Sequence, residues 1–327
     1  MKQILATLEA KKQRLDAHRP LPLALVRNLN DWFSIELTYT SNAIEGNTLS
    51  RAETALIVEK GLTVEGKTLS EHLEAVNHAQ AIEYVATLSN RTRVDLTQKH
   101  LLELHRLILQ KIDDANAGRY RSVSVRIAGS RAIMPNPMKV PRLCDEFMTW
   151  LTKAQGNELM IAADAHFRFV SIHPFTDGNG RTARLLMNLV LMQAGFPPAI
   201  IRKEDRKRYI DSIEAGQLGK SLDDYYQLIF ESVDRSLDIY LDAVEQKEKT
   251  DVITNKKQIK IGELATLAGE SVPTIRHWTK EGLLAVAARS PGGYQLYDVS
   301  QVGVIKKIIK LQEKRFTLAE IKKSLNT

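Results

Sequence analysis

The chain has 327 residues, of which 43% are hydrophobic and 26% are charged, and its formal net charge at pH 7 is +7. This length predicts about two domains with a sizeable buried core. The single cysteine, Cys144, excludes an intrachain disulfide and indicates a reducing compartment. No apolar run is long enough to cross a membrane, and the first residues lead into Lys-rich polar sequence, unlike the apolar region of a signal peptide. We therefore expect a cytoplasmic protein without a membrane partner.

The first segment of chemical interest ends at Gly46. Apolar residues recur at helical spacing between Trp32 and Ile44, so Ser41 and Glu45 fall one turn apart on one face of a predicted helix. Gly46 is a natural residue to stop that helix. A glutamate in the last turn is unfavourably placed against the negative end of the helix dipole, which indicates a cation from elsewhere in the fold. A solvated surface glutamate is the alternative.

Two short β-prone segments follow, at 121–127 and 131–134, joined by Ala-Gly-Ser at 128–130. A Pro-Asn-Pro sequence at 135–137 ends the second segment. The pattern predicts one β-hairpin in an otherwise helical region. Because a lone hairpin is only marginally stable, we expect this one to pack on helices.

Residues 173–184 read His-Pro-Phe-Thr-Asp-Gly-Asn-Gly-Arg-Thr-Ala-Arg. Apolar residues at helical spacing precede this segment, and its proline disfavours the helical conformation at His173, so one helix should end there. Gly178 and Gly180 allow the backbone to turn its N–H groups inward, and a second helix over 181–193 presents an N-terminus that favours anions. The backbone therefore predicts a phosphate site.

The side chains of the same segment suit a polyphosphate. His173 titrates near neutrality, so its neutral imidazole can accept a proton. Asp177 suits Mg²⁺, which takes one or two carboxylates together with phosphate oxygens. Arg181 and Arg184 are three positions apart, so they share a face of the helix and offer forked donors.

The twelve residues match His-Pro-Phe-x-[Asp/Glu]-Gly-Asn-Gly-Arg-x-x-Arg at every position, so the chain resembles the Fic family of nucleotidyl transferases. The resemblance implies transfer of AMP from ATP to a Ser, Thr or Tyr hydroxyl of a protein, with release of pyrophosphate. His173 would take the hydroxyl proton, and Asp177 would hold Mg²⁺ on the nucleotide. The related Doc kinases carry Lys where this chain has Gly180 and transfer the γ-phosphate, so Gly180 favours AMP transfer. The other implied roles are an anion cradle from Gly178, Asn179 and Gly180, and contacts to the β- and γ-phosphates from Arg181 and Arg184.

Two earlier segments resemble other parts of this family. Residues 41–46 resemble its inhibitory motif, [Ser/Thr]-x-x-x-Glu-[Gly/Asn], in which Glu45 would pair with Arg184 and keep the γ-phosphate from its productive pose. Because this motif precedes the signature, the chain resembles the class with an N-terminal inhibitory helix. Residues 121–134 resemble the Fic flap, whose edge would hold a target peptide by strand addition.

Two residues near the signature have open interpretations. Tyr209 is a candidate for stacking on adenine, as similar positions do in the family, and a buried tyrosine with a bonded hydroxyl is the alternative. His166 lies two helical turns before His173 on the same face. Since a catalytic zinc site needs three ligands, we expect His166 to be a packing histidine.

The basic charge is concentrated at the C-terminal end. Residues 251–327 contain 13 Lys and Arg against 7 Asp and Glu, so this region carries +6 of the total +7. A charged stretch at 246–257 marks a candidate domain boundary, with a continuous helix as the alternative. Two short predicted helices at 261–265 and 271–278 are followed by a wing-like turn at 290–297 and two more helices.

This order of elements resembles the winged helix-turn-helix of the MerR family, whose second helix and wing contact duplex DNA. Two features depart from that family: Gln295 stands where those regulators usually place an arginine, and no long coiled-coil helix of the kind that normally pairs two such domains occurs up to Thr327. A small protein-docking module is the alternative. The candidate DNA contacts are Thr274, Arg276, His277, Lys280 and Arg289.

We therefore expect an all-α protein in three parts: an N-terminal helical region with the inhibitory helix (1–95), a Fic catalytic core with one hairpin flap (96–250) and a winged helix-turn-helix domain (251–327). The expected function is a self-inhibited protein adenylyltransferase that uses ATP and Mg²⁺ and modifies a target protein or itself. With Glu45 positioning water, the same site could also remove AMP. The alternative is a DNA-binding regulator whose Fic core senses nucleotide or modifies the chain itself, and the intact His173 favours the enzyme. Duplex DNA and a second copy of the chain, as a homodimer, are the other candidate partners.

Overall fold

The computed structural model describes residues 1–254, 258–289 and 294–325. The chain divides into two compact units, Met1–Asp242 and Ala243–Thr327. The division falls inside helix α10 (Asp223–Thr254), so the charged stretch expected as a boundary is helical up to Thr254, the alternative that the sequence left open. Residues 255–257 of that stretch lie outside the described residues. The finer division of the chain at residues 95 and 250 stays a prediction.

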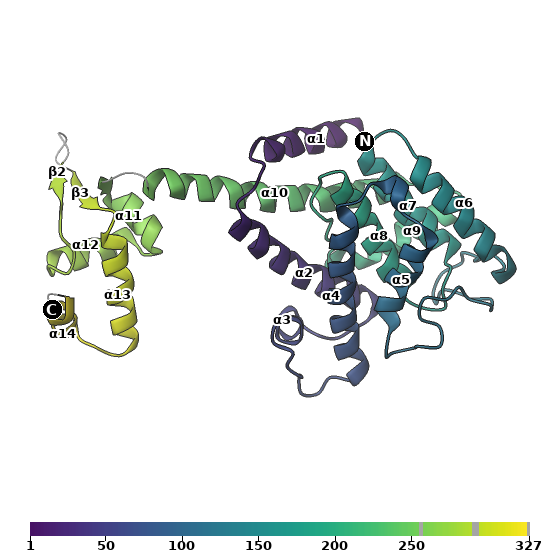
Figure 1. Ribbon diagram of the computed structural model, residues 1–327, viewed down its shortest axis with the longest axis horizontal. Helices are drawn as coiled ribbons and strands as arrows, with labels where there is room; N and C mark the ends of the chain where they lie inside the picture. Colours follow the sequence, from purple (N-terminus) through teal and green to yellow (C-terminus); the bar gives the residue numbers. More distant parts are fainter. Residues whose placement is uncertain (255–257, 290–293, 326–327) are drawn as a thin grey trace. The chain divides into compact units, whose positions relative to one another are not determined.

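The first unit is helical, as expected, and its helix α8 is buried on nearly every side. Helices α7, α4, α5 and α2 pack against α8 (Figure 1), and apolar residues from Leu185 to Leu191 fill the contacts. Within the described residues, no helix is long and apolar enough to cross a membrane. The elements of this unit are α1 (Lys2–Ala17), α2 (Leu23–Glu45), α3 (Arg51–Lys60), α4 (Leu69–Ser89), η1 (Arg93–Asp95), α5 (Gln98–Leu109), η2 (Pro137–Lys139), α6 (Val140–Lys153), α7 (Glu158–Ile172), α8 (Asn179–Gln193), η3 (Lys203–Asp205), α9 (Arg206–Gln217) and the start of α10.

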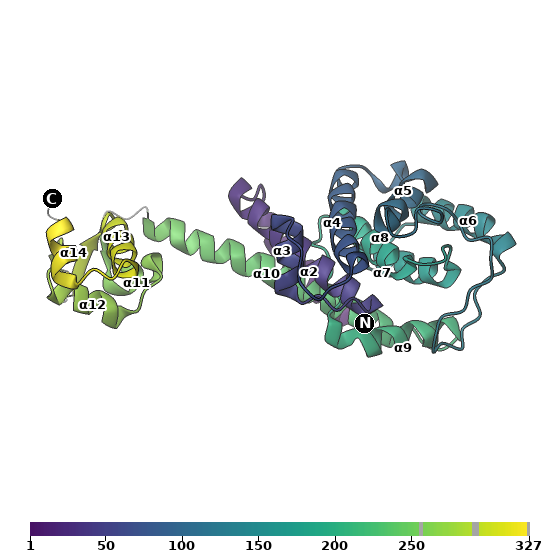
Figure 2. The same ribbon diagram turned by 90° about the horizontal axis from the view of Figure 1, so that it is seen from below.

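The loop between α5 and α6 differs from the prediction. Its two arms, at 121–127 and 131–134, are not paired as strands, so the paired hairpin is wrong within this described segment. The turn between the arms does form, with Ser130 N donating to Ile127 O at 3.1 Å. The arms bond to side chains instead of to each other: Glu214 of α9 accepts from Ser130 and from the backbone N–H of Arg131. Figure 2 shows the loop running beside α9.

The second unit contains a three-stranded antiparallel sheet in the order β1-β3-β2. The predicted helix pair is present, because α11 and α12 cover the two expected segments, whereas strand β1 was not predicted. Residues 290–293 of the predicted wing lie outside the described residues. The elements are β1 (Gln258–Lys260), α11 (Ile261–Ala268), α12 (Val272–Lys280), β2 (Ala288–Arg289), β3 (Gln295–Asp298), α13 (Gln301–Glu313) and α14 (Leu318–Leu325). Their core includes Leu264, Ile275, Trp278, Tyr297, Ile305 and Ile308.

Candidate active site

The candidate active site lies where α7 ends and α8 begins. His173 ends α7 in the left-handed conformation, with φ 50° and ψ 61°. For a side chain other than glycine this conformation costs on the order of 1–3 kcal/mol, so the surroundings must hold it. The N–H of His173 donates to Phe169 O at 3.0 Å, and its carbonyl accepts from Arg121 Nε at 2.8 Å.

Arg121 joins this histidine to the loop between α5 and α6. Its backbone N–H donates to Pro174 O at 2.9 Å. Its buried guanidinium donates to three carbonyls, those of His173, Val123 (3.0 Å) and Pro135 (2.6 Å). Because Val123 lies on the first arm of the loop and Pro135 directly follows the second, one side chain ties both arms to the catalytic candidate. Sequence reasoning noted Arg121 only as part of a family-like segment.

The ring of His173 suits a base that is neutral at physiological pH. Burial lowers the pKa of His173, Arg121 lowers it further, and the Val170 carbonyl works in the opposite direction. The Nδ1 atom is buried, and the Val170 carbonyl is the backbone group that acts on the ring. The Nε2 atom is therefore the ring nitrogen that can meet a substrate.

A side-chain bridge shapes the turn that follows His173. Asn179, at the start of α8, accepts from Phe175 N and donates to Phe175 O, both at 2.9 Å. The amide of Asn179 is thus used within the turn and is 3% exposed. Because both ends of the Asn179 amide are bonded to Phe175, only the backbone N–H of Asn179 can contribute to the predicted anion cradle.

His105 of α5 supports the same turn, and sequence reasoning missed it. Its ring stacks on Phe175 with centroids 3.5 Å apart. Its Nδ1 accepts from Gly118 N at 2.9 Å, so its Nε2 carries the proton and donates to Asp177 O at 3.0 Å. Burial lowers the pKa of His105 to about 4, which keeps this arrangement neutral. The one sequence signal was a histidine on the apolar face of a helix, which is too common to indicate a role.

Both cradle glycines lie where a Cβ would meet close neighbours. Gly178 has φ 73°, and a Cβ there would lie 3.2 Å from the His105 ring. At Gly180 a Cβ would collide with Glu45 Oε1 and come within 3.0 Å of Arg184 Nη1. The start of α8 therefore leaves room beside its backbone for the Glu45 carboxylate and the Arg184 guanidinium, and its role as a phosphate cradle stays a prediction.

The predicted metal ligand and the first signature arginine contact each other. The Asp177 side chain is 68% exposed, and its Oδ2 lies 3.1 Å from Arg181 Nη2. Arg181 is buried, and its Nη1 donates to Glu74 Oε1 of α4, also at 3.1 Å. Glu74 belongs to neither predicted motif. The exposed carboxylate of Asp177 at a helix N-terminus suits a hydrated Mg²⁺ shared with phosphate oxygens.

Arg184 is paired with the predicted inhibitory segment. Its Nη2 donates to Glu45 Oε1 at 2.7 Å and to Ser41 O at 3.0 Å, and its Nε donates to Ser41 Oγ at 2.9 Å. Burial works against the charge, yet the Glu45 carboxylate raises the pKa of Arg184. The structure therefore brings together Ser41, Glu45 and Arg184 as the resemblance implied.

The end of the inhibitory helix has a second cation. Gly46 stops α2 in the left-handed conformation, with φ 107°, as predicted. Arg206 of α9 donates from Nε to Ile44 O at 2.6 Å, in the last turn of α2. Arg184 and Arg206 together supply the positive charge that the position of Glu45 indicated.

Tyr209 is buried, which was the alternative to its stacking on adenine. Its side chain is 3% exposed, so its ring is not available to a base in this structure. Its hydroxyl donates to His166 Nε2 at 2.6 Å and accepts from Arg184 Nη1 at 3.4 Å. His166 Nδ1 lies 2.9 Å from the hydroxyl of Tyr225, which donates to Ala163 O.

His166 is therefore a packing histidine, as expected. Both its ring nitrogens are bonded, and burial lowers its pKa to about 3. Within the described residues, no cluster of three or more His, Cys, Asp or Glu side chains could hold a metal ion by itself. A site that shares its cation with a nucleotide needs fewer protein ligands.

Known proteins resemble this chain in sequence and fold. Residues 95–191 match the Fic/DOC family. The protein adenylyltransferase Fic of Culex quinquefasciatus is 38% identical over 243 residues, which cover 73% of this chain and 48% of that protein. The structure of Fic-1 from C. elegans, a segment of residues 134 to 508 in its own numbering, is 30% identical with a TM-score of 0.69, over 75% of this chain and 73% of that chain. This chain belongs to the Fic/DOC family.

The Fic likeness extends to bacterial structures. A Fic domain containing signaling protein from Bacteroides thetaiotaomicron is 27% identical with a TM-score of 0.64, over 74% of this chain and 98% of that one. The chain spans about half the length of the curated Fic relatives that it matches. Glu45 and Glu74 precede the segment that matches the Fic family, which contains the signature and the loop between α5 and α6.

The second unit of this Fic-family chain has its own match. Residues 259–327 match the MerR HTH family regulatory protein. Of the candidate DNA contacts, Arg276, His277, Lys280 and Arg289 are exposed, whereas Thr274 is half-buried and bonds to Ser271 at the start of α12.

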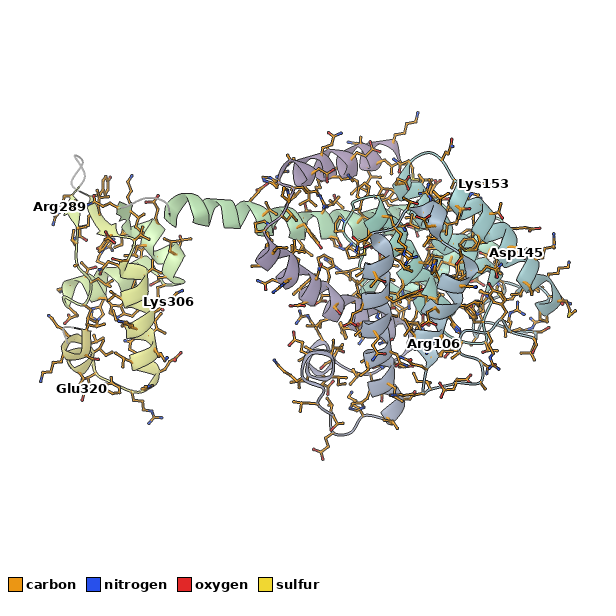
Figure 3. The ribbon with its side chains drawn as sticks, in the orientation of Figure 1. Arg106, Asp145, Lys153, Arg289, Lys306 and Glu320 are labelled. Atoms are coloured by element: carbon orange, nitrogen blue, oxygen red, sulfur yellow. The ribbon has the colours of Figure 1, made fainter. Side chains whose placement is uncertain are left out.

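Two of these candidate DNA contacts line one groove in the second unit. Arg276 and Arg289 line a space of about 590 Å³ together with Lys260 and Tyr294. Figure 3 labels Arg289 on β2 and Lys306 on α13, which is outside that lining. The structure does not bring His277 or Lys280 into the lining of the groove.

Proposed function

We propose that this chain is a self-inhibited protein adenylyltransferase that transfers AMP from ATP to a Ser, Thr or Tyr hydroxyl of a target protein or of itself. The observation that carries the proposal is a neutral histidine, His173, held beside an open helix N-terminus with two buried arginines. The names of the Fic relatives support the same reaction. Gly180 supports AMP transfer over phosphate transfer, since it leaves the start of α8 without a side chain.

The proposed chemistry uses groups that the site holds in place. His173 Nε2 accepts the proton of the target hydroxyl while the hydroxyl oxygen bonds to the α-phosphorus of ATP. The bond between the α-phosphorus and the bridging oxygen to the β-phosphate breaks, and pyrophosphate leaves. Asp177 would hold Mg²⁺, which neutralises charge on the phosphates. The N–H groups around Gly178 and the guanidinium of Arg181 would bind phosphate oxygens.

The inhibitory part of the proposal rests on the contact between Glu45 and Arg184. One guanidinium cannot hold a carboxylate and a γ-phosphate in the same fork, so the paired state favours an unproductive nucleotide. Glu45 also lies close enough to the start of α8 to activate a water for removal of AMP. The balance between the two reactions depends on whether Glu45 stays on Arg184.

Labelled ATP tests the reaction directly. The purified chain, incubated with a lysate and Mg²⁺, should add labelled protein over the lysate alone from ATP carrying label in the α-phosphate, and should add none from ATP carrying it in the γ-phosphate. His173→Ala should reduce the α-label transfer by roughly 10² to 10⁴, as expected for loss of a general base. Added label from the γ-phosphate over the lysate alone, or equal α-label transfer by His173→Ala, would refute the proposal.

A second candidate function comes from the groove that Arg276 of α12, Arg289 of β2 and Lys260 of β1 line. Arg276, Arg289 and Lys260 place positive charge along it, and the MerR match supports duplex DNA as the ligand. In this version the Fic core senses nucleotide or modifies the chain itself to control DNA binding. Cytoplasmic location and a homodimer complete the proposal.

A further inference from the structure

Arg181 has a partner that the proposed reaction leaves unexplained. Its side chain is 3% exposed and lies between two carboxylates, Asp177 on Nη2 and Glu74 on Nη1, each at 3.1 Å. Glu74 comes from α4, outside the signature and outside the inhibitory segment. A buried arginine needs compensation for its charge, but a single carboxylate would provide it. The second carboxylate therefore calls for a separate explanation.

The two carboxylates differ in how firmly they are held. Asp177 is 68% exposed, and its other oxygen accepts from the neighbouring Gly178 N. Glu74 is 20% exposed, and its Oε2 accepts from Asn47 Nδ2 at 2.8 Å. Asp177 is thus free to turn toward a cation, whereas Glu74 is fixed at both oxygens. If Asp177 turns away, Nη2 of Arg181 loses its partner while Nη1 keeps Glu74.

The second carboxylate oxygen of Glu74, Oε2, contacts the residue that follows the inhibitory segment. Asn47 follows Gly46 directly, and its backbone N–H donates to Asn42 O at 3.0 Å, in the last turns of α2. Its Oδ1 accepts from Leu49 N at 2.9 Å, so its Nδ2 must be the group that donates to Glu74. One carboxylate therefore contacts both a phosphate-site arginine and the turn that ends the inhibitory helix.

We propose that Glu74 is a positioning residue of the phosphate site. Glu74 holds Nη1 of Arg181 so that Nη2 faces the start of α8. When ATP binds, Asp177 turns toward the cation, and a phosphate oxygen of ATP replaces it as the partner of Nη2. Through Asn47, the same carboxylate fixes the turn that carries Glu45 toward Arg184. This inference rests on the proposed function for the identity of the nucleotide, but it concerns binding and not transfer.

The test measures nucleotide binding in the full chain. Parent and variants carry His173→Ala to prevent turnover and Glu45→Gly to free Arg184, and calorimetry gives the dissociation constants for ATP and for AMP, each with Mg²⁺. Glu74→Ala should weaken ATP binding by about 10- to 100-fold, the range expected when a binding group is misplaced by an ångström or so. Glu74→Gln should lie in between, because its amide oxygen still accepts from Arg181. Glu83→Ala, an exposed glutamate on the same helix, should bind ATP like the parent.

AMP separates positioning from a general effect on the fold. AMP lacks the phosphates that Arg181 would contact, so Glu74→Ala should leave AMP affinity within about twofold of the parent's. Equal losses for ATP and AMP, or no loss for ATP, would overturn the inference. A double-mutant cycle gives a second route: in an Arg181→Gln chain, Glu74→Gln should cost little further ATP affinity, and additive losses would overturn the inference.

The two proposals can fail separately. A chain that never transfers AMP, but loses ATP and not AMP affinity with Glu74→Ala, would refute the proposed reaction and keep the role of Glu74. A chain that transfers AMP, but binds ATP equally well with and without Glu74, would support the proposed reaction and refute the role of Glu74. Asn47→Ala tests the contact between Glu74 and Asn47. It should raise AMP transfer by the otherwise unmodified chain, because the turn after Glu45 is loosened. Unchanged transfer would show that this contact does not position Glu45.

Discussion

Arg184 Nη2 donates to Glu45 Oε1 over 2.7 Å, which joins two residues 139 positions apart in the chain. The same guanidinium also bonds to the carbonyl and hydroxyl of Ser41, so the last turn of α2 encloses it. A phosphate can reach Arg184 in this geometry if Glu45 leaves. Under the proposed function, this contact would control access of the γ-phosphate to Arg184.

Removal of Glu45 should activate the chain. Glu45→Gly frees Arg184 for the γ-phosphate, so AMP transfer, including self-modification, should rise by about tenfold or more, equivalent to about 1.4 kcal/mol or more of lost competition. Glu45→Gln should activate less, because the amide keeps the shape of the side chain. The measurement is self-labelling from ATP carrying label in the α-phosphate. Unchanged or lower labelling in Glu45→Gly would leave Glu45 as an ordinary residue at the end of a helix.

The acid limit of activity should report the environment of His173. Burial lowers the pKa of His173 from its ordinary 6.5, so the neutral ring persists as the pH falls through that value. With Glu45→Gly chains, kcat/KM should therefore stay level down to a pH below about 6.5 and then decline. The same shift should remove stability as the pH falls below about 6.5, because the unfolded chain binds the proton more readily. An NMR titration of the ring with a midpoint above 6.5 would contradict this prediction.

Arg121 should matter for both stability and catalysis. Arg121→Ala leaves three carbonyls without their donor and releases both arms of the loop, so we expect a loss of about 3 kcal/mol in the free energy of unfolding and a lower kcat. Arg121→Lys should recover only part of either quantity, since an ammonium cannot span the three acceptors. Urea unfolding and steady-state rates measure the two effects. Arg119→Ala is the matched control. A stability loss there as large as in Arg121→Ala would show that the three bonds from Arg121 to carbonyls are not the cause.

The groove of the second unit should respond to salt if it binds DNA. In the full chain, Arg276→Ala and Arg289→Ala should each weaken duplex binding at all sequences and reduce the slope of log K against log salt by about one. Lys306→Ala removes an equal charge from α13, outside the groove, and should leave the slope nearly unchanged. Fluorescence anisotropy at several salt concentrations provides the slopes. Equal effects from all three substitutions would indicate general charge attraction and not a specific groove.

Local sequence patterns predicted the parts of the site that depend on neighbouring residues. Pro174 and the glycines of the signature determine where α7 ends and α8 begins, so both helices were expected at the right places. Glu45 in the last turn of a helix indicated a cation, with a solvated surface glutamate as the alternative, and the structure places Arg184 and Arg206 there. These inferences needed no long-range contact to be known in advance, except for the pairing with Arg184, which came from the family resemblance.

The parts that sequence reasoning missed depend on contacts between distant segments. His105 and Glu74 lie on α5 and α4, and neither has a neighbour in sequence that reveals a role. The loop between α5 and α6 has the alternation of a hairpin, but Arg121 and Glu214 take the backbone groups that would have formed the ladder. Tyr209 was open between two roles because its burial depends on α7 and α8, which pack over it.

The missing side chain at Gly180 constrains how this protein can evolve. A Cβ at this position would meet the Glu45 carboxylate and approach the Arg184 guanidinium, so any larger residue would force the ends of these two side chains to move. A lineage that exchanged this glycine would therefore have to rearrange the contact between Glu45 and Arg184 in the same mutational step.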